Sequence, residues 1–141
     1  MKYRVIYWSQ TGNTEEMANA VAEGINEAGG EAEVLEVTDI SPEDLSDDKA
    51  FALGCPAMGD EVLEEGDMEP FVEELEASVK DKKIALFGSY GWGDGEWMRS
   101  WVERMQNAGA EIVTGEGLIV QESPEDEDLE KCKNLGKALT E

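Results

Sequence analysis

The sequence predicts an α/β fold, in which helices cover both faces of a parallel sheet. Five apolar segments of strand length alternate with segments whose apolar residues recur at helical spacing, and this alternation is typical of βαβ units. Hydrophobic residues make up 40% of the chain, which argues against disorder despite 34 acidic side chains. The chain has 141 residues and no evident linker or internal repeat, so we expect one domain, 1–141.

The first elements form a strand–helix–strand unit. The apolar run at 2–8 predicts a strand, and apolar residues recurring every four positions within 14–28 predict a helix. Gly29-Gly30 supplies the stop of that helix. The stretch 32–37 predicts the second strand, and SPED at 41–44 predicts a short helix or turn.

The rest of the chain repeats this alternation of strands and helices. The further predicted strands are 49–54, 83–89 and 111–120, the last of them broken by Gly115 and Gly117. The further predicted helices are 71–79, 97–105 and 129–139. Pro70 lies where it could help the first of these helices to start.

Charge and composition exclude several classes of function. The net charge of −23 would repel nucleic acid and anionic membranes, and it favours a basic protein partner or serves solubility. The chain lacks histidine, and Cys55 and Cys132 are far apart, so we expect no metal site and two buried free thiols. Without a signal peptide or a membrane-spanning segment, a cytoplasmic location is expected.

A polar loop follows the first strand. Its residues are Ser9, Gln10, Thr11, Gly12, Asn13 and Thr14. Ligands of parallel α/β sheets bind beyond the carboxyl ends of the strands, and a helix start favours an anion. Because the loop has no lysine or arginine, neutral donors would hold that anion. The alternative is ordinary capping of the helix by Asn13 or Thr14.

Two further loops carry unusual residues. They are CPAMGDE at 55–61 and SYGWGDGEW at 89–97. Trp92 is flanked by glycines on its loop, where its ring could stack on a flat ligand, and Met58 could cover the second face of that ligand. The alternative is that Trp92 and Met58 pack against each other.

Together, the three loops resemble those of the flavodoxins. The matching stretches are YWSQTGNTEEMA at 7–18, LGCPAMGDE at 53–61 and LFGSYGWGDGEW at 86–97. The resemblance covers essentially the whole chain and looks closest to the short-chain flavodoxins of anaerobic bacteria. It implies a doubly wound, five-stranded parallel sheet in the order 2-1-3-4-5, with FMN at the switch point.

The resemblance also implies which residues bind FMN. These are Ser9, Gln10, Thr11, Gly12, Asn13, Thr14, Pro56, Ala57, Met58, Gly59, Asp60, Glu61, Ser89, Tyr90, Gly91, Trp92 and Gly93. The loop 9–14 would hold the phosphate, Met58 and Trp92 would enclose the isoalloxazine ring, and 59–61 would contact N5 and the pyrimidine side.

Two residues depart from the pattern of the relatives. Gln10 replaces a small residue, so its side chain is expected to point outward. Pro56 offers no hydroxyl where some relatives carry serine, which removes one possible phosphate contact.

The implied function is low-potential, one-electron transfer between redox proteins, by a carrier rather than an enzyme. We expect the chain to act as a monomer whose partners present basic surfaces, because its own charge is −23. Two alternatives remain at this point. One is an FMN-dependent reductase of a small molecule, and the other is an anion-binding module without redox function.

Overall fold

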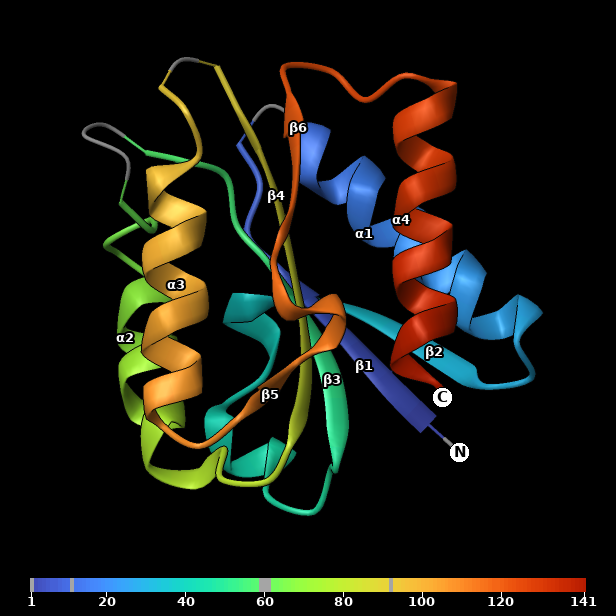
Figure 1. Ribbon diagram of the computed structural model, residues 1–141. Coiled ribbons are helices and arrows are strands. Elements are labelled where there is room, and N and C mark those ends of the chain that lie inside the picture. Colours follow the sequence, from blue (N-terminus) through green and yellow to red (C-terminus); the bar gives the residue numbers. More distant parts are fainter. Residues whose placement is uncertain (1, 11, 59–61, 92) are drawn as a thin grey trace.

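The computed structural model describes residues 2–10, 12–58, 62–91 and 93–141. Its parallel sheet has the order β2-β1-β3-β4-β5, and β6 also pairs with β4 (Figure 1). The strands are β1 (Lys2–Tyr7), β2 (Glu31–Glu36), β3 (Ala50–Gly54), β4 (Lys83–Tyr90), β5 (Glu111–Ile112) and β6 (Leu118–Gln121). The expected strand order is therefore confirmed.

Helices cover both faces of the sheet, as predicted. The α-helices are α1 (Asn13–Glu27), α2 (Met68–Leu75), α3 (Glu96–Asn107) and α4 (Asp126–Leu139). Short 3₁₀ helices are η1 (Val37–Asp39), η2 (Pro42–Leu45), η3 (Glu76–Ser78) and η4 (Val113–Gly115). Figure 1 shows α1 and α4 on one face and α2 and α3 on the other. No helix in the described ranges is both long and apolar enough to cross a bilayer.

Each face of the sheet has its own apolar core. Trp97, Trp101 and Phe71 belong to the core under α2 and α3, whereas Met17 and Val21 belong to the core under α1 and α4. Burying these side chains removes apolar surface from water, which is the main force that holds helices on a sheet.

Both cysteines are buried and free, as the sequence indicated. Burial raises the pKa of Cys55 and of Cys132 to about 12. Neither thiol is therefore a reactive thiolate near neutral pH. Within the described residues, no group of three or more acidic or cysteine side chains is arranged to hold a metal ion.

The fifth position of the sheet contains the predicted broken strand. Glu111 and Ile112 of β5 pair with the start of β4, and β6 pairs with its end, from Phe87 to Tyr90. Between them the backbone turns through Thr114 and Gly115, whose φ angles are 67° and 82°. Positive φ suits glycine but is uncommon for a β-branched residue, so the strand cannot run straight through this point.

The second helix starts differently from the prediction. Pro70 lies inside α2, which begins at Met68. The carboxylate of Glu64 accepts hydrogen bonds from the backbone N–H groups of Gly66, Asp67 and Met68, at 2.7, 2.7 and 2.9 Å. These bonds satisfy N–H groups at the helix start, so Glu64, not Pro70, fixes where α2 begins.

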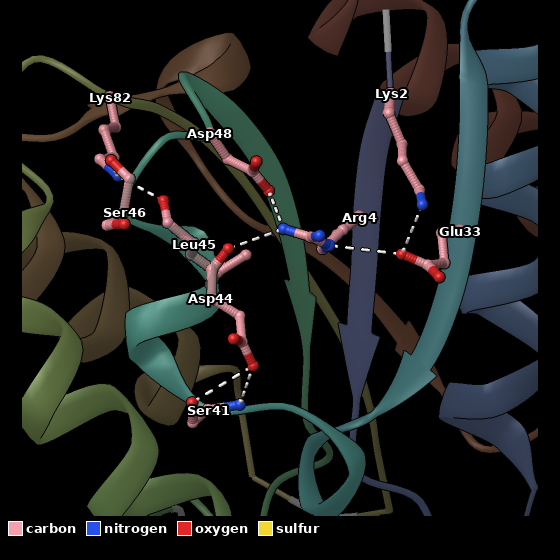
Figure 2. A network of polar contacts seen from close by, with 9 residues as sticks. All are labelled: Lys2, Arg4, Glu33, Ser41, Asp44, Leu45, Ser46, Asp48 and Lys82. Carbon is pink, nitrogen blue, oxygen red and sulfur yellow. Dashed lines mark hydrogen bonds and ion pairs between the residues drawn. The ribbon is translucent and has the colours of Figure 1, made fainter.

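A polar network lies near the amino ends of the strands (Figure 2). Arg4 of β1 donates to the carboxylate of Asp48 at 2.9 Å, to the carbonyl oxygen of Asp44 at 2.8 Å and to Glu33 at 3.3 Å. Burial alone would lower the pKa of Arg4, but the charges of Asp48 and Glu33 outweigh it and raise that pKa. Lys82 donates to the carbonyl oxygens of Leu45 and Ser46.

Candidate functional site

A cavity of about 230 Å³ lies where β1, β3, β4 and β6 end. We name this end of the sheet the carboxyl edge and the space the carboxyl-edge cavity. Its lining residues are Ser9, Gln10, Asn13, Thr14, Pro56, Ala57, Met58, Ser89, Tyr90, Gly91 and Glu122. The switch point between β1 and β3 lies at this edge, so the cavity is where a doubly wound sheet binds its ligand.

The start of α1 faces the cavity. Gly12 is the N-cap residue, its φ is 94°, and among the described residues no side-chain hydrogen bond caps the helix start. The first helical bond runs from the N–H of Glu16 to the carbonyl of Gly12, at 3.0 Å. The N–H groups that come before Glu16 in the first turn of α1 therefore have no partner within the helix. Capping by Asn13 or Thr14 is thus wrong, because both residues lie inside α1.

Two buried hydroxyl groups meet beside this helix start. Thr14 of α1 and Ser89 of β4 are 1% and 5% exposed, and no other polar or charged residue in the described ranges is classed as buried. Their hydroxyl oxygens lie 3.1 Å apart and share a hydrogen bond. This bond uses one of the two hydroxyl protons, and both residues line the cavity, so one O–H donor is left for a ligand there.

The second loop is held against β4 and α3. The N–H of Cys55 donates to Phe87 and that of Ala57 donates to Ser89, at 3.1 and 3.0 Å. The indole N–H of Trp97 donates to the carbonyl oxygen of Cys55 at 3.1 Å. These contacts fix the chain just before Pro56 and Met58, which line the cavity.

The third loop continues from β4. The ring of Tyr90 lies against the ring of Trp97, with centroids 5.7 Å apart. Trp97 therefore contacts the supports of both loops, whereas the sequence placed it only at the end of the third loop and the start of a helix. Its hydrogen bond to Cys55 joins residues that are 42 positions apart, which no local pattern could reveal.

Most of the predicted site residues gather at the cavity. Ten of its lining residues were predicted, namely Ser9, Gln10, Asn13, Thr14, Pro56, Ala57, Met58, Ser89, Tyr90 and Gly91. Gly12 precedes α1, and Gly93 is not among the lining residues. Thr11, Gly59, Asp60, Glu61 and Trp92 lie outside the described residues. Gln10 is exposed and also lines the cavity, so the expected outward direction of its side chain stays a prediction.

Glu122 lines the cavity and was not predicted. Its N–H donates to the carbonyl of Tyr90 at 2.7 Å, and its φ is 60°. Gln121 pairs with Tyr90, so Glu122 is the first residue beyond β6 at the carboxyl edge. The sequence did carry one signal for Glu122. It follows the fifth predicted strand, and the carboxyl ends of parallel strands meet at the edge where the ligand binds.

The electrostatic character of the cavity is neutral to acidic. No lysine or arginine lines it, and all 11 of those side chains lie among the described residues. At the end of β1, Tyr7 donates to the carboxylate of Glu15 at 3.1 Å. Burial, assisted by that carboxylate, raises the pKa of Tyr7 to about 12. An anion in the cavity must therefore be held by neutral hydroxyl and N–H donors.

The sheet order and a ligand site at the β1–β3 switch point define a doubly wound α/β protein of the mononucleotide-binding class. The flavodoxin family model matches residues 5–136, and the chain belongs to the flavodoxin family.

Individual relatives agree with this assignment. The chain is 48% identical to the flavodoxin of Clostridium beijerinckii, with 96% of this chain and 97% of the relative covered. It is 43% identical to the flavodoxin of Megasphaera elsdenii, with 95% of each chain covered. The solution structure of the two-electron reduced M. elsdenii flavodoxin matches with a TM-score of 0.88 and 41% identity, over 97% of each chain.

Membership of the family also decides the function class. Flavodoxins are FMN-binding electron carriers rather than enzymes, and this chain is an FMN-binding electron carrier. The resemblance drawn from the three loops is thereby confirmed. The small-molecule reductase and the anion-binding module without redox function are not favoured.

Proposed function

We propose that the chain is a low-potential, one-electron carrier that holds one FMN non-covalently in the carboxyl-edge cavity. The observation that carries the proposal is the buried hydroxyl pair of Thr14 and Ser89 beside the start of α1. The phosphate of FMN would accept hydrogen bonds from the 9–14 loop and from the first N–H groups of α1. FMN supplies the one-electron chemistry when it is bound.

Either hydroxyl could donate in the hydrogen bond between Thr14 and Ser89, and a phosphate beside Thr14 would select the direction. If Thr14 donates its proton to a phosphate oxygen, its own oxygen is free to accept the proton of Ser89. Ser89 is therefore a positioning residue that orients the Thr14 hydroxyl toward the phosphate. The N–H of Gly12 donates to the hydroxyl oxygen of Ser9 at 3.1 Å, which leaves the Ser9 proton available for the same anion.

The ring of FMN would lie against the second and third loops. Met58 and Tyr90 line the cavity, and Trp92 and the segment 59–61 complete the proposed contacts. Trp97 holds the second loop through the carbonyl of Cys55. The chain thus offers a preformed wall, and this reduces the entropy cost of binding.

Acidic side chains support the low potential. Reduced FMN carries negative charge, and a carboxylate ~10 Å away opposes that charge by roughly 0.5 kcal/mol at intermediate dielectric. Glu122 lines the cavity, and no lysine or arginine there offsets its charge. Because salt screens exposed carboxylates, the contribution of Glu122 should decrease as ionic strength rises.

The same charge supports the remaining parts of the proposal. A net charge of −23 favours partners with basic surfaces and opposes self-association, so we propose a monomer that exchanges electrons with basic redox proteins. We propose that residues 1–141 act as one FMN-binding domain in the cytoplasm.

The test compares FMN with riboflavin, which lacks the phosphate. The purified chain should show flavin absorption bands and bind one FMN. Thr14→Ala should weaken FMN binding by about 1.5–3 kcal/mol, the range for a hydrogen bond to a charged group, and should leave riboflavin binding nearly unchanged. Equal losses for both ligands would contradict a phosphate at Thr14, and a chain without flavin bands would contradict the proposed function.

A further inference from the structure

Met58 lines two separate spaces. One is the carboxyl-edge cavity, and the other is an adjoining hollow of about 540 Å³, to which Trp8 and Val62 also contribute. We name the second space the Trp8 hollow. A ligand in the cavity would contact Met58 from one side, and a small molecule from solution would still reach it through the Trp8 hollow.

Met58 is the most accessible sulfur-containing side chain in the described ranges. It is half-buried, whereas exposure is at most 2% for Met17, Met68, Met98 and Met105. Cys55 and Cys132 are fully buried, and burial raises the pKa of each thiol to about 12. Because oxidants attack the thiolate of a cysteine, neither thiol competes near neutral pH. A small oxidant should therefore react at Met58 before it reacts at these other sulfur atoms.

The backbone holds Met58 in the cavity wall. Its N–H donates to the carbonyl of Val62 at 2.9 Å, and the N–H of Val62 donates back to the carbonyl of Met58 at 3.0 Å. The residue before it, Ala57, donates to the carbonyl of Ser89 at 3.0 Å. These bonds keep the main chain in place, so a chemical change of the Met58 side chain acts directly on the shape and polarity of the cavity.

Hydrogen peroxide converts a methionine to its sulfoxide. The thioether sulfur attacks one peroxide oxygen with a lone pair, an S–O bond forms and the O–O bond breaks. The other oxygen leaves as water after it takes up the proton of the transferred oxygen, so sulfur is oxidised and the peroxide is reduced. The product is polar and chiral where the thioether was apolar. It is therefore a poorer neighbour for an aromatic ring than the thioether.

We propose that Met58 is a redox-sensitive modification site, at which a peroxide forms the sulfoxide and thereby weakens the binding of FMN. The inference rests on the proposed function, since it requires the flavin ring to lie against Met58. Methionine sulfoxide reductases reverse the modification, so the site acts as a switch rather than as irreversible damage. The chain would release its flavin while peroxide is present and bind it again afterwards.

The test treats the FMN-loaded chain, with FMN in the oxidised state, with hydrogen peroxide. Peptide mass spectrometry measures the sulfoxide at Met58 and at Met98 over time. Met58 should react about 10-fold faster than Met98, because susceptibility follows exposure. The dissociation constants of FMN and riboflavin are measured by flavin fluorescence before and after treatment. Both should rise about 3- to 10-fold, the scale of a lost sulfur–ring contact, because Met58 faces the ring and not the phosphate.

Met58→Leu and Met98→Leu are the matched variants. Both replace a thioether with an apolar side chain of similar volume. Met98 lines a third hollow, which shares no lining residue with the carboxyl-edge cavity. Peroxide should weaken FMN binding by Met98→Leu as much as by wild type, and it should leave the FMN affinity of Met58→Leu as it was before treatment. A methionine sulfoxide reductase should restore the affinity of the treated wild-type chain.

Three results would each overturn the inference. They are equal oxidation rates at Met58 and Met98, an unchanged flavin affinity once Met58 is oxidised, and an equal loss of affinity in Met58→Leu and wild type. The flavin spectrum of the untreated chain is recorded first. A wild-type chain without flavin bands contradicts the proposed function, whereas a flavin-loaded chain that gives any of the three results contradicts only the modification site.

Discussion

The two edges of the sheet satisfy their polar groups in opposite ways. Near the amino ends of the strands, Arg4 is surrounded by Asp48, Glu33 and a backbone carbonyl, so its charge is met within the chain (Figure 2). At the carboxyl edge, Thr14 and Ser89 have mainly each other, and the first N–H groups of α1 have no partner within the helix.

The difference shows how one sheet can separate stability from binding. Where polar groups are satisfied within the chain, a substitution should change the free energy of unfolding and leave FMN binding intact. Where they are left for a ligand, a substitution should mainly change FMN affinity. The predictions below test this separation, from the largest expected effect to the smallest.

Arg4→Met should destabilise the chain by about 2 kcal/mol. The substitution keeps an apolar stem but leaves Asp48, whose side chain is 20% exposed, without its cation. FMN affinity should stay within about 2-fold of wild type, because Arg4 is remote from the cavity. Denaturant unfolding at a fixed FMN concentration measures the loss.

The control for Arg4 is Arg99→Met. Arg99 pairs with Asp94, but the two side chains are 62% and 78% exposed, so its removal should cost less than about 0.5 kcal/mol. Equal losses for the two variants would show that the polar network around Arg4, which we name the amino-edge network, contributes no more than an exposed ion pair.

Gly88→Ala should break the separation, because it should reduce both stability and FMN affinity. A Cβ at Gly88 would overlap the carbonyl oxygen of Cys55, the residue before the cavity loop. Overpacking of this kind costs about 1–3 kcal/mol. Gly24→Ala is the matched control, because its Cβ would overlap the carbonyl of Lys133 at the α1–α4 contact.

The two glycine variants are compared by unfolding and by FMN titration. Both should unfold more easily, and only Gly88→Ala should also bind FMN more weakly. If Gly24→Ala weakens FMN binding as much, strain spreads through the sheet and the two edges are not independent.

Two tryptophans on α3 provide a finer comparison. Trp97 donates to Cys55, whereas the indole N–H of the buried Trp101 has no hydrogen-bond partner among the residues that the structure describes. Both Trp→Phe substitutions lose packing, but only Trp97→Phe also removes a hydrogen bond to a buried carbonyl. Trp97→Phe should therefore be more destabilising by about 1 kcal/mol, and it alone should weaken FMN binding. Equal effects in unfolding and FMN titration would show that the bond to Cys55 contributes nothing.

These comparisons also show what the sequence could reveal. The 9–14 loop could be predicted as a ligand site because the strand, the polar loop and the helix follow one another directly along the chain. Glu122 was missed because its place depends on the register of β6 against β4. The start of α2 was misplaced because a side chain four residues earlier, Glu64, satisfies its N–H groups. In each miss, a contact outside the local pattern decided the structure.

The smallest effect concerns the pH dependence of Glu33. Burial alone would raise the pKa of Glu33, but its hydrogen bonds to Lys2 and Arg4 lower that pKa below the ordinary value of 4.5. A carboxyl group with a lowered pKa stabilises the fold above the pKa of the unfolded chain, and this contribution disappears as pH falls through the folded pKa. The Glu33 side chain is 37% exposed, so solvent screens the interaction and the contribution should stay below about 1 kcal/mol.

The free energy of unfolding is measured against pH for wild type and Glu33→Gln. Their difference should be constant above about pH 5 and shrink below it. A difference that stays constant into the acid range would show that Glu33 is no better paired in the folded chain than in the unfolded one, and that the amino-edge network owes its stability to Arg4 and Asp48 alone.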